Sequence, residues 1–351
     1  MKTTPVVFTV HDTYQIMVPT STASLMWVRV GEKNYYDESN GILRSECGIH
    51  RMIVPAKELD RMQQYTICER KIIERKAYFT ETEEVKETEF FFIPVRGEAI
   101  RCFHVADAHN RITEPVRAAK YYGDIDFLIM NGDIPEDSDR IENFDTIYGI
   151  ASQITGGHIP VVFARGNHDL RGALAEKIAE YCPNENGHTY FTFRLGNIWG
   201  IVLDCGEDKV DKTVEYGNTV CCHVLRERQT QFLKQVIAQK EYEADDIAYR
   251  IVVVHNPFSQ QIGEPFNIEA DIYTEWGRLL KENVQPHVMI CGHLHRLEIH
   301  MPGCEEDHLG QPCPVIVGAM PGQDYFAGAG ILFDKDGINV TFVDSNGNKW
   351  K

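Results

Sequence analysis

The first 95 residues alternate hydrophobic and polar positions in short runs. The runs at 24–30 and 89–95 show this alternation, and turn-forming residues separate them from their neighbours. A period of two is typical of strands with one buried face. The segment 69–76 is highly charged and suits a helix by composition, but its place among strands favours an exposed, charged strand. Residues 1–95 are therefore predicted to form a small all-β sandwich domain.

From residue 96 onward the pattern changes to apolar runs separated by longer amphipathic segments, and the chain is predicted to form a second domain over 96–351. Strands that alternate with helices are typical of an α/β fold with a layered sheet. We expect strands at 100–105, 127–131, 161–164, 189–195, 198–203, 250–254 and 288–290. We expect helices at 114–122, 139–154, 172–181, 226–240 and 271–283. Alternating segments at 297–300, 315–317, 331–333 and 338–343 indicate antiparallel strands that complete a second sheet.

Composition places the chain among ordinary globular proteins, with 43% hydrophobic and 25% charged residues. Lys and Arg total 35 against 52 Asp and Glu, so the net charge is −17 and the long-range field repels nucleic acid and anionic membrane. No apolar stretch is long enough for a membrane span or an export signal, and the ten cysteines are expected to be reduced. We therefore expect a cytoplasmic protein with no nucleic-acid or membrane partner.

Polar clusters follow the apolar runs at the points where strands are predicted to end. These clusters are Asp107-Ala108-His109, Gly132-Asp133, Gly166-Asn167-His168-Asp169, His255-Asn256 and Gly292-His293-Leu294-His295. In α/β sheets ligands bind where the carboxyl ends of the strands open into loops, so clusters far apart in sequence can form one site.

The side chains in these clusters suit divalent metal ions. Carboxylate, amide and imidazole ligands together favour Mn, Fe or Zn, and the absence of cysteine from the clusters argues against a structural zinc. Asp107 and His109 flank an apolar residue, as do His293 and His295, so an extended backbone would turn both members of each pair to one face. The glycines would let the backbone bend beside a crowded centre.

The ordered set D-x-H, G-D, G-N-H-D, H and G-H-x-H resembles that of the calcineurin-like metallophosphoesterases, over residues 98 to 335. The resemblance implies a four-layered α/β/β/α sandwich, here preceded by a small all-β domain of fibronectin III or immunoglobulin type. The order of domains resembles that of purple acid phosphatases. Those enzymes have a Tyr ligand three residues after the Asp of the Gly-Asp motif, where this chain has Glu136.

The same resemblance implies a ligand set and a reaction. Two divalent metal ions are expected, and a hydroxide that bridges them would act as the nucleophile in the hydrolysis of a phosphate ester. One ion would be held by Asp107, His109 and His295, the other by Asn167, His255 and His293, and Asp133 would bridge them.

Two further residues are candidates for catalysis. By the same resemblance, His168 would contact the substrate phosphate or protonate the leaving oxygen. Asp169 would orient His168 through a hydrogen bond, or would cap a helix over 170–181. The irregular segments 204–222 and 257–267 are candidates for shaping the pocket, and His223 ends the first of them.

The sequence leaves the substrate open. The expected substrate is a small phosphorylated compound, and the alternatives are a diester such as a cyclic nucleotide or a glycerophosphodiester. A third hypothesis is a catalytically weak metal-binding scaffold of the same fold that recruits a protein partner through the N-terminal domain. For the N-terminal domain, a protein partner and self-association both remain open.

Overall fold

The computed structural model describes residues 1–350, in which most strands belong to one large sheet with two halves. In the first half three strands run parallel, and three more follow, each antiparallel to the strand before it in the sheet. The strands of this half are β11 (Ile100–Val105), β12 (Phe127–Asn131), β13 (Pro160–Ala164), β20 (Phe326–Asp334), β21 (Gly337–Asp344) and β22 (Lys349–Trp350).

The second half has four neighbouring parallel strands with an antiparallel strand at either side. Its strands are β14 (Phe191–Leu195), β15 (Ile198–Leu203), β16 (Tyr249–Val254), β17 (Val288–Cys291), β18 (Arg296–His300) and β19 (Val315–Pro321). Antiparallel pairing of β19 with β20 joins the two halves.

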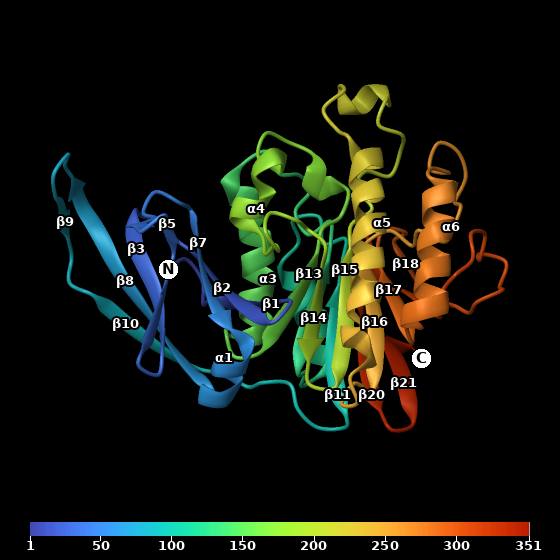
Figure 1. The fold of residues 1–351 in the computed structure, drawn as a ribbon, viewed down its shortest axis with the longest axis horizontal. Helices are drawn as coiled ribbons and strands as arrows, with labels where there is room; N and C mark the ends of the chain where they lie inside the picture. The colour runs from blue at the N-terminus through green and yellow to red at the C-terminus, as the bar shows by residue number, and fades with distance from the viewer. Residues whose placement is uncertain (351) are drawn as a thin grey trace.

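Helices cover the outer faces of both halves. They are α2 (Thr113–Tyr122), α3 (Asp145–Thr155), α4 (Ile178–Tyr181), α5 (Cys222–Gln239) and α6 (Ala270–Leu279), the last continued by a π-helical turn, Leu280–Val284. Figure 1 shows α3 beside the N-terminal strands and α5 and α6 on the other side of the central strands. Among the described residues, five short 3-10 turns lie in the connections: Ile141–Phe144, His168–Leu170, Ala175–Lys177, Val214–Tyr216 and Glu241–Glu243.

Three apolar cores explain the layering. In β12, Ile129 packs in the core shared with Ile251 and Ile290 of the other half, whereas its neighbour Leu128 packs in a second core with Ile147 of α3. A third core lies under α5 and α6. Because successive side chains of a strand point to opposite faces, strands covered on both faces are apolar throughout. The result is the expected α/β/β/α sandwich.

The N-terminal segment contributes to the large sheet and also forms a second sheet. Its strands in the large sheet are β1 (Val6–Val10), β2 (Thr13–Pro19) and β7 (Ile49–Pro55). The second sheet consists of β3 (Ser24–Val30), β4 (Lys33–Tyr36), β8 (Gln64–Arg75), β9 (Thr80–Thr82) and β10 (Lys86–Phe91). A small hairpin, β5 (Glu38–Ser39) and β6 (Ile42–Leu43), and a helix, α1 (Ala56–Met62), complete this part.

The strand β1 pairs in parallel with β13, with Val7 opposite Pro160. The core between the two N-terminal sheets is therefore continuous with the core between the halves of the large sheet. The division into domains at residue 95 stays a prediction. Such a division would place the paired strands β1 and β13 in different domains.

Most of the elements expected after residue 96 are present within a few residues of their predicted ends. The charged segment 69–76 is confirmed as a strand, because it lies almost wholly in β8. The helix expected over 172–181 is wrong in extent. Gly172 has φ +118° and packs against the backbone of Asp139, so the chain forms only a 3-10 turn and the single turn α4.

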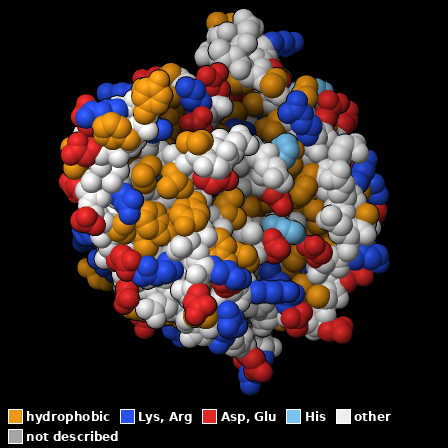
Figure 2. Space-filling view, turned by 60° about the vertical axis from the view of Figure 1, so that its left-hand side comes forward, with side chains coloured by type: hydrophobic (Ala, Val, Ile, Leu, Met, Phe, Trp, Pro, Cys, Tyr) orange, Lys and Arg blue, Asp and Glu red, His pale blue; other side chains and the backbone are white. Residues whose placement is uncertain are grey.

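The surface mixes charges of both signs. On the face seen in Figure 2, acidic and basic side chains are interspersed around a group of apolar side chains. Among the described residues, none of the helices has the length and apolar character that a membrane crossing requires.

Replacement of Phe8 by alanine tests whether β1 belongs to the main core. The Phe8 ring is fully buried and makes edge contacts with Tyr148 and Phe163, at centroid distances of 6.3 and 6.1 Å. We expect Phe8→Ala to lower the free energy of unfolding by about 3–5 kcal/mol, measured by chemical denaturation. The fully exposed Tyr78 gives the control, and Tyr78→Ala should change this free energy by about 0.5 kcal/mol or less. Equal effects would show that β1 is not part of the core.

Candidate metal centre

The clusters predicted from the sequence follow five strands whose carboxyl ends meet at one edge of the fold. Asp107 and His109 follow β11, Asp133 follows β12 and Asn167 follows β13. From the other half of the sheet, His255 follows β16, and His293 and His295 follow β17. Both halves therefore contribute to the site.

The first group of side chains comprises Asp107, His109 and His295, whose ligand atoms lie within 4.8 Å of one another. His295 Nε2 lies 3.4 Å from Asp107 Oδ1 and 3.2 Å from His109 Nε2. Asp107 is fully buried, whereas His295 is partly exposed. The group therefore opens toward solvent on the His295 side.

The second group comprises Asp133, His255 and His293, again within 4.8 Å. His255 Nε2 lies 3.1 Å from Asp133 Oδ2 and 3.7 Å from Asp107 Oδ1, so the two groups are adjacent. Asn167 joins the second group through its Oδ1, which lies 3.0 Å from His293 Nδ1. All seven predicted ligands are thus brought to one place.

The backbone at these residues is unusual. Asp107, His109, Asp133, His293 and His295 all have positive φ angles, between 45° and 68°. The extended backbone expected at the Asp-x-His and His-x-His pairs is therefore wrong, because both pairs lie in turns beyond the strand ends. Non-glycine residues in this region carry a strain of about 1–3 kcal/mol each, which clusters at functional sites.

Glycines allow the loops to approach closely. A Cβ on Gly166 would lie 2.2 Å from Asp133 Oδ1 and 2.5 Å from the Asp133 backbone nitrogen. A Cβ on Gly292 would lie 2.6 Å from Asp107 Oδ2. These distances are below van der Waals contact, so the ligand loops can pack this way only with glycine at both positions.

Charge in the site is arranged for a cation. Burial would lower the pKa of His255, but the carboxylates of Asp133 and Asp107 outweigh it and raise that pKa to about 10. For His293, burial and the neighbouring charge on His255 lower the pKa to about 4. Two buried carboxylates thus share one protonated imidazole, and this group of candidate ligands keeps an excess of negative charge.

Two contacts fit a metal ion better than they fit hydrogen bonds. The Nε2 atoms of His109 and His295 face each other, although at most one of two neutral imidazoles can donate there. The Asn167 amide turns its oxygen to His293 and its nitrogen to the Arg171 guanidinium, whereas the reversed amide would hydrogen bond to both. These orientations are favourable when a cation receives the lone pairs, so the residues present fit divalent metal ions.

A surrounding shell of hydrogen bonds holds the ligands. His255 Nδ1 donates to the carbonyl oxygen of Asn131 at 2.6 Å, which leaves Nε2 free to face the carboxylates. The backbone nitrogen of His293 donates to Asp107 Oδ2 at 2.9 Å. Partners of this kind fix the tautomer and the orientation of metal ligands.

His168 and Asp169 lie beside the groups but do not contact each other as predicted. His168 Nδ1 donates to the carbonyl oxygen of Glu136 at 2.8 Å. The Asp169 carboxylate is fully buried and accepts from the backbone nitrogens of Gly166 and Asp133, at 2.7 and 3.3 Å. The expected hydrogen bond between His168 and Asp169 is therefore not formed, because the carboxylate points to the turn at Gly166 instead. Nor does Asp169 cap a helix, since it lies within the 3-10 turn His168–Leu170.

Sequence patterns did not indicate that Arg171 contacts His168 or that Glu136 contacts His109. Arg171 Nη1 donates to His168 Nε2 at 3.0 Å, while Nε and Nη2 make paired hydrogen bonds with the buried Glu207. Glu136 Oε2 lies 2.9 Å from His109 Nδ1. No motif marks Arg171 or Glu207, since the two meet only through the fold.

A pocket of about 420 Å³ opens over the site. The two irregular segments proposed to shape it both contribute, through Asp208 and Lys209 from the first and Ile262 and Phe266 from the second. His223 lies outside the pocket lining, and its Nδ1 is 3.0 Å from the Glu269 carboxylate. The pocket is completed by the residues Asp133, Asn167, His168, Arg171, His293, Leu294, His295 and Arg296.

Comparisons with known proteins agree with this architecture. The model of the family described as calcineurin-like phosphoesterase matches residues 100–297. A purple acid phosphatase isolated from yellow lupin (Lupinus luteus) seeds has a similar structure, with a TM-score of 0.61 and 12% identity over 100% of this chain and 73% of that one. The structure of PhoD is similar with a TM-score of 0.54 and 11% identity, over 96% of this chain and 91% of that one. At these identities the two structures show a shared fold alone. No curated protein sequence matches the chain.

Replacement of Gly166 tests the close packing of the loops. We expect Gly166→Ala to weaken metal binding by about 10–100-fold, because its Cβ would displace Asp133. Metal titration followed by calorimetry measures this change. Gly187→Ala is the control for backbone strain away from the site, because φ is +86° there while a Cβ meets no atom within 4 Å, and it should leave metal binding unchanged. Unchanged affinity in Gly166→Ala would contradict the role given to this glycine.

Proposed function

Since this chain belongs to the calcineurin-like phosphoesterases, and is thus a metal-dependent phosphoesterase, we propose that it hydrolyses phosphate esters at a dinuclear centre. The single observation that supports the proposal is the convergence of seven candidate oxygen and nitrogen ligands from five loops on one place, where four of them line a pocket. Asp107, His109 and His295 would hold one divalent ion, and Asn167, His255 and His293 the other. Asp133 would be shared.

Two bound Mn, Fe or Zn ions would supply positive charge for the phosphate and a lowered pKa for the water between them. The chain itself supplies the orientation of the ligands. Asp133 Oδ1 accepts from the backbone nitrogen of His168 at 2.8 Å, so the proposed shared carboxylate is fixed by the loop that carries the catalytic histidine. Asp169 acts as a positioning residue, because its two backbone contacts hold the Asp133 and Gly166 turns together.

His168 is placed to act on the substrate. Its Nδ1 is occupied by the Glu136 carbonyl, so Nε2 is the nitrogen available to the pocket. Arg171 holds that nitrogen at 3.0 Å and is itself fixed by Glu207. We propose that the substrate displaces the Arg171 contact, and that His168 Nε2, after taking up a proton from solvent, gives this proton to the leaving oxygen as the phosphorus–oxygen bond breaks.

The volume and the lining of the pocket favour a small phosphorylated substrate. Its volume of about 420 Å³ is near the lower end of the range for small-molecule sites. The cations Arg171, Lys209 and Arg296 line it together with the apolar side chains of Ile262 and Phe266. Within an acidic protein, this local basic lining favours an anionic ester with an apolar leaving group.

The role of His168 is tested by comparing leaving groups. A proton donor matters most when the leaving oxygen is strongly basic, so His168→Ala should lower kcat/KM for an alkyl phosphate by about 10²–10⁴-fold. The loss should be clearly smaller for a nitrophenyl phosphate, whose leaving oxygen needs little help. His188→Ala replaces an exposed histidine and serves as the control. Equal losses with both esters would instead assign His168 to binding of the phosphate.

The enzyme as a whole is tested with Asp133→Asn. Loss of the proposed shared carboxylate should abolish turnover of the nitrophenyl ester at every Mn²⁺ concentration and should reduce the bound metal. Steady-state kinetics and elemental analysis measure the two effects. Wild-type turnover no faster than that of Asp133→Asn would contradict the proposed function and favour a non-catalytic scaffold.

A further inference from the structure

A second cluster of metal-ligating side chains lies in the N-terminal part of the chain. Asp37 lies between β4 and β5, Cys47 follows β6, and His50 is the second residue of β7. Their ligand atoms lie within 4.8 Å of one another. From the geometry we infer that Asp37, Cys47 and His50 bind a zinc-like divalent ion at a site separate from the proposed centre.

The distances fit one face of a tetrahedral site. Cys47 Sγ lies 3.4 Å from His50 Nδ1 and 3.5 Å from Asp37 Oδ2. Ligands of tetrahedral zinc at their usual bond lengths stand about 3.4–3.6 Å apart. The remaining pair, His50 Nδ1 and Asp37 Oδ2, is hydrogen bonded at 2.7 Å and has to open by about 0.6 Å to admit the ion.

The same distances exclude a thiol nucleophile with a histidine base. In such a triad one imidazole nitrogen faces the nucleophile and the other faces the carboxylate. Here Nδ1 of His50 faces both partners, because Cys47 Sγ is closer to Nδ1 than to Nε2, at 3.4 against 3.8 Å. Three atoms that converge on one point are typical of a metal site.

Burial and charge support a bound cation. His50 is fully buried and the Asp37 side chain is 4% exposed, so polar groups here need partners. Arg44 Nη1 lies 3.4 Å from Asp37 Oδ1, which is the other oxygen of the carboxylate. Oδ2 therefore remains available to an ion.

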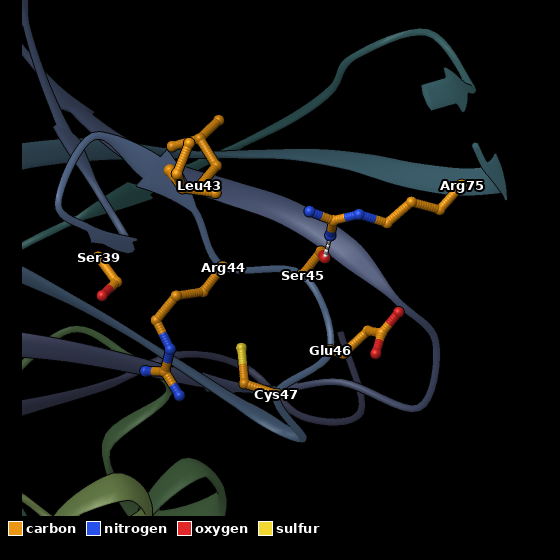
Figure 3. Close-up of a pocket in the computed structure, with 8 residues that line it drawn as sticks. Ser39, Leu43, Arg44, Ser45, Glu46, Cys47 and Arg75 are labelled. Atoms are coloured by element: carbon orange, nitrogen blue, oxygen red, sulfur yellow. Dashed lines mark hydrogen bonds between the residues drawn. The ribbon is translucent and has the colours of Figure 1, made fainter. Parts of the chain in front are cut away.

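The cavity beside Cys47 offers a route for the ion and for a fourth ligand. It has a volume of about 420 Å³ and is open to solvent. Figure 3 shows the Cys47 sulfur directed into it, between Arg44 and the Ser45–Arg75 contact, with Glu46 at the rim. Three protein ligands and one solvent position are a common arrangement for zinc.

Binding of the divalent ion would release the proton of the Cys47 thiol. Burial and the nearby Asp37 raise the pKa of the Cys47 thiol to about 12, so the thiol keeps its proton in the absence of an ion. An incoming divalent ion displaces that proton to solvent, and the neutral imidazole then carries its proton on Nε2. The bound ion would tie the turn at Cys47 to β7. The adjacent Gly48 packs against Ile141 of the catalytic part.

Cobalt binding to the full chain tests the inference. A Co²⁺–thiolate bond gives a charge-transfer band in the near ultraviolet, and none of the seven candidate ligands of the other centre is a cysteine. We expect the wild type to show this band and Cys47→Ser to lose it. Cys304→Ser, at the cysteine that lies close to His300 and Glu306, should keep it. Phosphoesterase activity should persist in Cys47→Ser, so the result is independent of the proposed function.

A second variant, Asp37→Asn, provides an independent test in case Cys47→Ser does not fold. Asp37→Asn keeps the sulfur but loses a charged ligand, so about tenfold more Co²⁺ should be needed to reach half of the band. No thiolate band in the wild type would overturn the inference. It would also be overturned if the band persisted in Cys47→Ser, or if Asp37→Asn bound Co²⁺ as tightly as the wild type.

Discussion

Close contact between the loop carrying Asp133 and the loop carrying Gly166 is the constraint on which the site depends. The Gly166 backbone nitrogen and the Asp133 backbone nitrogen both donate to the buried Asp169 carboxylate. This carboxylate replaces solvent for two strand ends that would otherwise expose their amide groups. Because the two turns are held in this way, the side chains of Asp133 and Asn167 point into the same pocket, and strained backbone conformations persist at several ligands.

Electrostatic frustration accompanies the geometric strain. Buried carboxylates raise the pKa of His255, while the His293 imidazole is kept neutral. The Nε2 atoms of His109 and His295 face each other, and the Asn167 amide is oriented against its hydrogen-bonding preference. Both arrangements are unfavourable without a bound cation. Stability and function are therefore in conflict at this edge of the sheet, and the three cores below it provide the rigidity that maintains the arrangement.

Sequence patterns predicted the strands and the positions of the polar clusters well, because a fully buried strand such as β12 must be apolar and polar residues can follow only at its end. They could not predict backbone conformation at Asp107 or His293, since the left-handed turns result from crowding between loops distant in sequence. The partner of Asp169 was missed for the same reason. Asp37, Cys47 and His50 follow no spacing motif, so only the folded chain brings them together.

The pairing of β1 with β13 also has a consequence for biosynthesis. Val7 emerges from the ribosome long before its neighbour Pro160, and the intervening stretch of about 150 residues takes roughly 8 to 30 s to translate. During that interval the amino-terminal sheet has an unpaired, apolar edge, which is a hazard for association with other nascent chains. Cellular yield of this protein should therefore depend on how well chaperones shield that edge until the later strand arrives.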